Sequence, residues 1–231
     1  MKSIKIACSG FPVGQKMYRA RLGAVELSQM FDGLPRAATL ERWREESDAK
    51  FEFIACAPED VTHLQASAAE RGHHKRGAFQ NTTPVHHAFR GTVAAAAALK
   101  AKLLFVRIPR TMTAHADNVD RIMRFFKTAD RGPLTVVWEP PVSWPASIVE
   151  GVSKALHFVT AMNPLSGKAP PKGPVRYFRI GAHGATGGIH SVTDAELAKI
   201  KDACHGATSY VVFNNGPRSF DDAVRFAATI Y

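Results

Sequence analysis

Two glutamates are the residues of this sequence best placed to carry acid–base chemistry. Glu26 and Glu139 each stand in a short apolar run that is typical of a β-strand. Side chains alternate between the two faces of a strand, and in both runs this alternation predicts that the glutamate points to the inner face. Two inward carboxylates could form an acid/base or nucleophile pair, as in glycoside hydrolysis. Arg179 shares this inward phase on another run, so the candidate catalytic residues are Glu26, Glu139 and Arg179.

Two arginines give these carboxylates a second interpretation. Arg107 ends one apolar run and Arg179 lies near the end of another. Because a buried carboxylate needs a partner, the arginines could instead neutralise the glutamates in buried ion pairs that hold the protein together. The sequence leaves open a catalytic pair, two structural pairs, or neither.

A second candidate site is rich in glycine. Residues 181–188 read GAHGATGG, and residues 214–218 read NNGPR. Glycine lets several backbone N–H groups converge on one anion, and the planar fork of arginine suits phosphate. The residues that could bind a phosphate or another anion are Arg107, Gly181, His183, Gly184, Gly187, Gly188, Asn214, Asn215 and Arg218. The alternative is a pair of turns in which glycine serves only tight bends.

Histidine is concentrated between residues 63 and 87, where five of the ten histidines fall. The adjacent pair His73 and His74 diverges on any regular element, and no spaced pair such as HExxH is present, so no metal site is predicted. A basic loop with Arg71, Lys75 and Arg76 is the favoured interpretation, and it would overhang the end of a strand.

Other reactive motifs are absent from the sequence. It holds no nucleophile elbow, Walker loop or dinucleotide-binding fingerprint, so no cofactor is predicted. Cys56 has no histidine partner in the sequence and is interpreted as a small core residue. The three cysteines fit neither a zinc knuckle nor a disulfide framework, which favours a reduced, cytoplasmic location. The first residues lack the apolar region of a signal peptide, and no apolar run is long enough to span a membrane.

These candidates need elements to position them. Short β-rich runs alternate with helical patterns, which predicts a parallel sheet with crossover helices. Eight strands, the number that closes a barrel, are predicted at residues 3–9, 24–30, 51–56, 103–108, 134–139, 158–161, 175–180 and 209–214. Helices are predicted after a cap at Thr39, over residues 83–99 and 117–126, from Thr193, and over residues 219–230.

The predicted fold class is α/β, a compact TIM-type barrel. The 231 residues suit a single domain over residues 1–231. Only residues 10–23 separate the first two strands, so the first crossover is predicted to be shortened. In such a barrel the active site lies at the C-terminal ends of the strands, where most of the candidate residues stand.

Short motifs, in order along nearly the whole chain, support this fold. They are residues 6–12 (IACSGFP), 25–31 (VELSQMF), 34–35 (LP), 42–43 (RW), 51–53 (FEF), 62–63 (TH), 177–179 (YFR), 183–184 (HG) and 210–215 (YVVFNN). Together they resemble the YecE-like family, also called domain of unknown function 72. The resemblance implies a TIM-type barrel and no particular reaction.

The chain also departs from the pattern of that family. The family usually has a lysine near the end of the third strand, where this chain has Cys56 and Ala57. It usually has Glu-Phe-Arg-His after the fifth strand, where this chain has Glu139, Pro140 and Pro141. A common chemistry that requires those groups would be lost or altered here.

The net charge of +10 raises the local concentration of anions. We therefore expect an enzyme that acts on a phosphate-bearing substrate, a nucleotide or nucleic acid, at the C-terminal face of the barrel. The alternatives are a non-catalytic nucleic-acid-binding protein and a glycosidase-like hydrolase with a carboxylate pair. The predicted partners are an anionic small molecule or nucleic acid, and no membrane; no oligomeric state is predicted.

Overall fold

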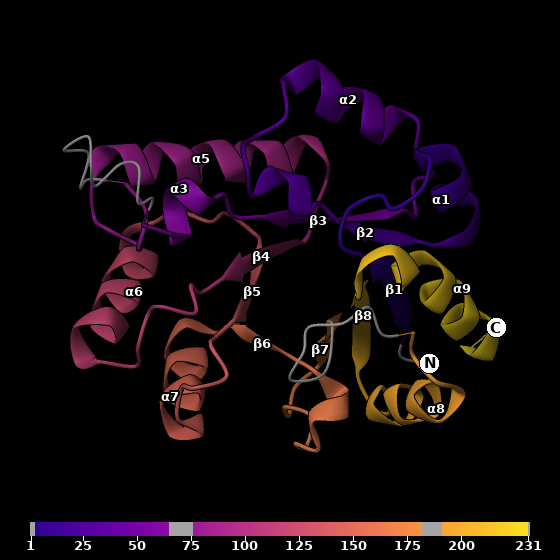
Figure 1. The fold of residues 1–231 in the computed structure, drawn as a ribbon. Coiled ribbons are helices and arrows are strands. Elements are labelled where there is room, and N and C mark those ends of the chain that lie inside the picture. Colours follow the sequence, from indigo (N-terminus) through magenta and orange to yellow (C-terminus); the bar gives the residue numbers. More distant parts are fainter. Residues whose placement is uncertain (1–2, 65–75, 182–190, 231) are drawn as a thin grey trace. The chain divides into compact units, whose positions relative to one another are not determined.

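The computed structural model describes residues 3–64, 76–181 and 191–230. Strands and helices alternate along the chain (Figure 1). The chain forms two compact units. Unit 1 comprises residues 1–27, 47–52 and 161–231, and unit 2 comprises residues 28–46 and 53–160.

Unit 1 is built on parallel strands. They are β1 (Ile4–Cys8), β2 (Ala24–Glu26), β7 (Val175–Gly181), β8 (Thr208–Asn214) and the second half of β6 (Val159–Met162). β8 pairs with β1 on one side and with β7 on the other, and β6 continues the row beyond β7. β2 joins beside β1 through a parallel bridge between Ser9 and Glu26. The C-terminal ends of these strands therefore share one edge.

The helices of unit 1 are α1 (Gln15–Arg21), α8 (Asp194–Ala203) and α9 (Ser219–Ile230), with single turns at η2 (Pro164–Ser166) and η3 (Gly216–Arg218). The seven residues of α1 confirm the predicted short first crossover. Tyr18 compensates for that thin cover: its buried hydroxyl accepts from the Cys8 N–H at 2.7 Å and donates to the Ala24 carbonyl at 2.8 Å. One side chain thus links α1 to both β1 and β2.

Unit 2 contains three further strands and most of the outer helices. Its elements are η1 (Ser28–Met30), α2 (Ala37–Glu45), β3 (Glu52–Cys56), α3 (Glu59–Thr62), α5 (Thr83–Ala98), β4 (Leu103–Arg107), α6 (Ala116–Thr128), β5 (Thr135–Glu139), α7 (Ala146–Leu156) and the first half of β6. Glu52, the first residue of β3, belongs to unit 1. The strands pair in parallel in the order β3, β4, β5 and β6, and the last residues of β4 and β5, Arg107 and Glu139, are register partners.

Aromatic side chains fill the space between the helices and strands of unit 2. Phe125 and Phe126 of α6 meet Phe79 and Phe89 edge to face or tilted, and Phe126 meets Phe158 at 4.8 Å between ring centroids. Such pairs stabilise a core by about 0.5–1.5 kcal/mol each beyond the burial of their area. This packing fixes α5 and α6 against the strands that carry Arg107 and Glu139.

The structure confirms the predicted strands to within a few residues, with one clear difference. β2 ends at Glu26, where a strand to residue 30 was predicted, and the chain turns into η1. In η1 the Phe31 N–H donates to the Ser28 carbonyl at 2.9 Å, a bond of a tight helical turn that an extended strand cannot form. The fold class is α/β, as predicted.

The predicted helices are also present, but one predicted cap is wrong. Thr39 lies inside α2, because its N–H already bonds to the carbonyl of Arg36, which is the N-cap. Thr193 does begin α8 and forms a capping box with Glu196. No helix was predicted at α3 or α7, which begin directly after Pro58 and Pro145.

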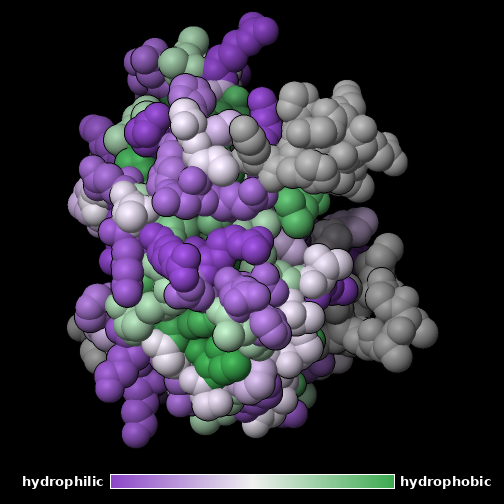
Figure 2. Space-filling model, turned by 90° about the vertical axis from the view of Figure 1, so that its left-hand side faces the viewer, coloured by the Kyte–Doolittle hydropathy of each residue, from purple (hydrophilic) through white to green (hydrophobic). Residues whose placement is uncertain are grey.

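The outer face of unit 2 is mostly polar. Figure 2 shows the side that carries α6 and α7 covered largely by hydrophilic residues, with a smaller hydrophobic area. Across residues 3–64, 76–181 and 191–230, no helix combines the length and the apolar character needed to cross a membrane.

Candidate functional site

Glu26 is the most deeply buried charged side chain that the sequence singled out. Its carboxylate has no exposed surface and Arg179 is 7% exposed. The Arg179 guanidinium donates through Nη2 to Oε1 at 2.9 Å and through Nε to Oε2 at 3.1 Å. The inward phase of the two strands thus brings Glu26 and Arg179 together in an ion pair, one of the arrangements that the sequence left open.

Two neutral donors complete the environment of this carboxylate. The Tyr177 hydroxyl donates to Oε2 of Glu26 at 2.6 Å, and the Ser9 hydroxyl donates to Oε1 at 2.8 Å. Arg179 also donates to the Ser9 oxygen at 3.2 Å. Tyr177 lies two residues before Arg179 and therefore on the same face of the strand, so the sequence could have predicted its contact with Glu26. Ser9 follows the end of β1, and no pattern in the sequence indicated its contact.

The electrostatics of this cluster hold Glu26 in its charged form. Burial by itself would raise the pKa of the Glu26 carboxyl, but the Arg179 guanidinium and the hydrogen bonds from Arg179, Tyr177 and Ser9 outweigh it and lower the pKa below its ordinary 4.5. A carboxylate in this state is a poor proton donor at neutral pH. The geometry therefore fits the structural pairing better than general acid catalysis.

The polar cluster continues through unit 1 by way of two tyrosines. Tyr177 stacks on Tyr210 with ring centroids 6.1 Å apart, and the Tyr210 hydroxyl donates to Glu52 at 2.7 Å. Lys5 forms an ion pair with Glu52 at 2.9 Å. Burial, and then the bond to Glu52, raise the pKa of the Tyr210 phenol, so it remains a donor across the physiological range.

Glu139 has a different environment, in unit 2. It forms an ion pair with Arg107, whose Nε lies 3.5 Å from Oε2 of Glu139, and the two side chains are 31% and 39% exposed. The Arg107 guanidinium also lies over the Phe31 ring, 5.5 Å from its centroid. This pair stands at the C-terminal ends of β4 and β5, the position where a TIM-type barrel places its active site.

His63 adds a titratable group to the same end of unit 2. Its ring meets Phe31 edge on at 4.9 Å, and its Nδ1 lies 2.7 Å from the Thr62 hydroxyl. Burial, and then the charge of Arg107, lower the pKa of the His63 imidazole below its ordinary 6.5. His63 is therefore neutral at pH 7. In the sequence, His63 stands out only as one of several clustered histidines and as part of the motif at residues 62–63.

The backbone beside His63 is strained. Gly77, Ala78 and Phe79 all have positive φ angles, of 75°, 48° and 56°. Bonds from the Gly77 and Phe79 N–H groups to the carbonyls of Asp60 and Val61 hold this conformation. A Cβ on Gly77 would lie 1.7 Å from the His63 carbonyl oxygen, so only glycine fits there. Strain of this kind is often found where a structure fixes a functional side chain.

The predicted glycine-rich anion site is described only in part. Residues 182–190, and with them His183, Gly184, Gly187 and Gly188, lie outside the described residues. Gly181 and Asn214 are register partners at the ends of β7 and β8, so the two loops begin side by side, as predicted. Arg218 is exposed. An anion between these loops stays a prediction.

Asp222 forms hydrogen bonds with described residues of both loops, the one after β7 and the one after β8. Its buried carboxylate accepts from the Val192 N–H at 2.9 Å and from the Asn215 side chain at 2.7 Å. The Asn215 backbone N–H donates to the Ser219 hydroxyl at 2.9 Å. These two donors of Asn215 are used within the protein, which weakens its predicted role as an anion contact.

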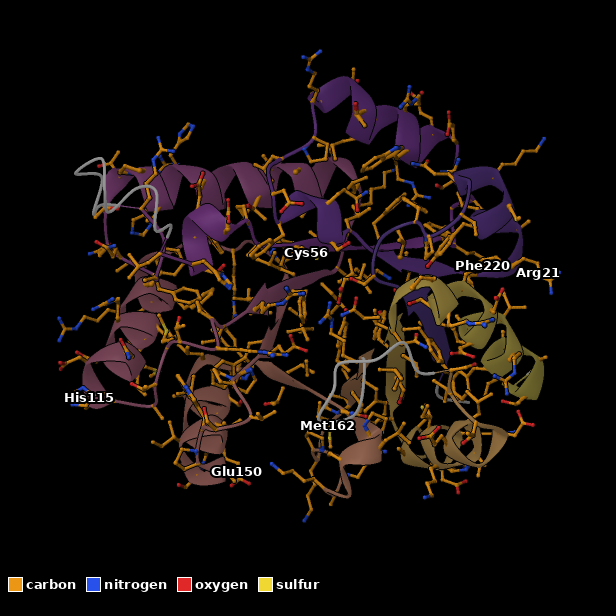
Figure 3. The ribbon with its side chains drawn as sticks, viewed as in Figure 1. Arg21, Cys56, His115, Glu150, Met162 and Phe220 are labelled. Atoms are coloured by element: carbon orange, nitrogen blue, oxygen red, sulfur yellow. The ribbon has the colours of Figure 1, made fainter. Side chains whose placement is uncertain are left out.

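Metal and thiol chemistry find little support in the described part of the chain. There, no three His, Cys, Asp or Glu side chains gather as a metal site would require. His73 and His74 are not among the described residues. Cys56 closes β3 (Figure 3) and is buried. The absence of a metal stays a prediction.

Comparison with known proteins bears on the fold and the family. A family model described as "Protein of unknown function DUF72" matches residues 15–140. A DUF72 family protein from Enterococcus faecalis has a similar structure, with a TM-score of 0.73 and 17% identity, over 100% of this chain and 98% of that one. A DUF72 family protein from Thermotoga maritima has a TM-score of 0.74 and 16% identity, over 99% of both chains.

A more distant likeness supports the same fold class. A xylose isomerase domain containing protein from Salmonella typhimurium has a TM-score of 0.63 and 11% identity, over 99% of this chain and 95% of that one. No curated protein matches the sequence. The likenesses confirm the predicted TIM-type barrel fold.

The two carboxylates should differ sharply in their contribution to stability. Glu26→Gln removes the buried charge that pairs with the Arg179 guanidinium, so we expect the free energy of unfolding to fall by about 3 kcal/mol or more. Glu139→Gln breaks a half-exposed pair and should cost less than about 1 kcal/mol. Urea unfolding measures both. Equal losses would show that the Glu26 cluster is not a special stabilising contact.

The pKa of His63 should respond to Arg107. Removal of the neighbouring charge in Arg107→Gln is expected to raise the His63 pKa, while burial still holds it below 6.5. NMR titration of the imidazole Hε1 proton measures this shift, with assignment from a His63→Asn variant. Arg90→Gln on α5 removes the same charge elsewhere and should leave the pKa unchanged. A wild-type midpoint at or above 6.5 would contradict the interpretation.

Proposed function

This chain belongs to the DUF72 family of TIM-barrel proteins, and we propose that it binds a phosphate-bearing substrate, a nucleotide or nucleic acid, at the C-terminal ends of β3, β4 and β5 and acts on it there. The observation that carries the proposal is the half-exposed Arg107–Glu139 pair, held over Phe31 and beside a neutral His63. All of these residues belong to unit 2.

Arg107 is suited to bind an anion because its own ion pair is weak. The Glu139 oxygen lies 3.5 Å from Nε, longer than a good hydrogen bond. Within the described residues, no hydrogen bond or ion pair uses the two Nη groups of Arg107, whose guanidinium lies over the Phe31 ring. An exposed pair of this kind contributes about 0–1 kcal/mol, whereas an arginine and a phosphate can form two parallel charge-assisted hydrogen bonds. Phosphate would therefore compete well for the guanidinium.

Phosphate binding would also place Glu139 next to the bound ligand. Once Arg107 turns to the phosphate, its long ion pair with Glu139 would be replaced by contacts to the ligand. A carboxylate within reach of a substrate hydroxyl or water can act as a general base. The neutral imidazole of His63 could accept or donate a hydrogen bond at the same end of the strands. The net charge of +10 would increase the rate at which anions reach this site.

The glycosidase-like alternative has less support. It requires two carboxylates that can exchange protons or attack the substrate. Glu26 is fully buried, accepts bonds from three side chains and has a lowered pKa, which argues against either role. The proposal therefore rests on Arg107 and Glu139, with Phe31 and His63 beside them, and does not use a pair of glutamates.

Calorimetric titration with inorganic phosphate and with AMP tests the proposal. Loss of a charge-assisted hydrogen bond contributes about 1.5–3 kcal/mol, so Arg107→Gln should weaken binding roughly 10- to 100-fold. Arg90→Gln, with the same change in net charge, should bind like the wild type. Wild-type protein that binds neither ligand, or equal affinities for the two variants, would overturn the proposal.

A further inference from the structure

We propose that the opposite end of unit 2 is a docking surface for the phosphate backbone of duplex nucleic acid. This surface, the basic rim, consists of Lys100, Lys102, Lys127, Arg131 and Lys154. It lies where β4, β5 and β6 begin, whereas Arg107 and Glu139 lie where β4 and β5 end. The basic rim is thus separate from the proposed substrate site and does not depend on it.

The topology of unit 2 brings these five cations to one edge. β4, β5 and β6 are paired neighbours, with Leu103 opposite Thr135 and Val137 opposite Val159. Lys100 and Lys102 immediately precede β4, and Arg131 precedes β5. Parallel strands begin at the same edge of a sheet, so these connecting segments lie next to one another.

The ends of two helices add the remaining cations. Lys127 stands in the last turn of α6 and Lys154 in the last turn of α7, and these neighbouring helices run back to the same edge. Cations at helix C-termini are common because they interact favourably with the helix dipole. That explanation covers Lys127 and Lys154, but Lys100, Lys102 and Arg131 lie outside the helices and need another reason.

The charge of the basic rim is nearly all of one sign. The four lysines are exposed, and Arg131 is half-buried with its guanidinium over the Phe158 ring at 5.6 Å. None of the five forms an ion pair with any residue that the structure describes. Asp130 is the single acidic residue in the segments between these helices and strands, and its Oδ1 accepts from the Gly132 N–H. The five cations therefore remain available to a partner.

The excess of positive charge is confined to the end of unit 2 where the strands begin, as a comparison with the end where they finish shows. There, acidic residues accompany the cations: Asp60 lies 4.0 Å from Arg76, and Glu139 pairs with Arg107. The two ends of the same strands therefore differ, with mixed charge at the proposed substrate site and concentrated positive charge at the basic rim.

Duplex nucleic acid fits this surface best among polyanions. Neighbouring helices pack about 8–10 Å apart, so the ends of α5, α6 and α7 span about 20 Å. Duplex DNA carries one charge per about 1.7 Å, or about twelve phosphates over that length. Large apolar side chains are exposed at Met17, Leu34, Leu64 and Val142 among the described residues, and none is aromatic or on the basic rim. Base stacking and membrane insertion therefore lack the side chains that they use.

Fluorescence anisotropy with a labelled 20-base-pair duplex, measured from 25 to 200 mM NaCl, tests this inference. If all five cations contact phosphates, the slope of log Kobs against log salt is about −4.5, and the combined variant Lys100→Gln, Lys102→Gln and Arg131→Gln reduces its magnitude by about 2.7. The same variant should bind the duplex at least tenfold more weakly at the lowest salt concentration.

A matched control separates the basic rim from net charge. The combined variant Lys16→Gln, Arg21→Gln and Lys199→Gln removes three exposed cations from helices α1 and α8 of unit 1. It should retain most of the wild-type affinity and slope. Absence of wild-type binding at 25 mM NaCl, or equal effects of the two combined variants, would overturn the inference. So would binding to phosphatidylserine vesicles that the duplex cannot displace.

Discussion

A carboxylate removed completely from water needs a counter-charge and hydrogen bonds from the protein, and Glu26 imposes this condition in the interior of unit 1. Burial of an isolated charge costs several kcal/mol, so the fold has to supply Arg179, Tyr177 and Ser9 within bonding distance. These groups come from β7 and from the end of β1, while Glu26 lies on β2. The hydrogen bonds of the Glu26 carboxylate form only when all three strands have the correct register. The cluster therefore favours this one arrangement of the strands.

Two pairs of the same residue types take different roles because their burial differs. The Glu26–Arg179 pair is dry, bidentate and supported by two further donors, so any ligand that broke it would leave charges unpaired in the interior. The Arg107–Glu139 pair is partly exposed to solvent and its atoms are 3.5 Å apart, so water or a phosphate can replace this ion pair at little cost in free energy. The first pair suits a structural role and the second suits binding, which is why the proposed function rests on the second.

Much of this arrangement follows from the sequence, and the reasons are local. Alternation along the strands predicted that Glu26 and Arg179 would meet, and the short spacing before β2 predicted the reduced first crossover. Contacts between segments that are distant in the chain could not be predicted from such local patterns. Phe31 follows a turn that breaks the strand pattern, and its position under Arg107 depends on how η1 and β4 pack. The neutral state of His63 likewise depends on burial, which spacing along the chain does not reveal.

The ionisation state of Glu26 is the most direct test of this account. The Cδ resonance of Glu26 can be followed by ¹³C NMR between pH 7 and pH 4 and assigned by comparison with Glu26→Gln. Because Arg179 and the other donors hold the pKa below 4.5, the resonance should stay at the position of an ionised carboxylate through most of this range. A midpoint above 4.5 would show that burial dominates, and it would return Glu26 to the candidates for acid catalysis.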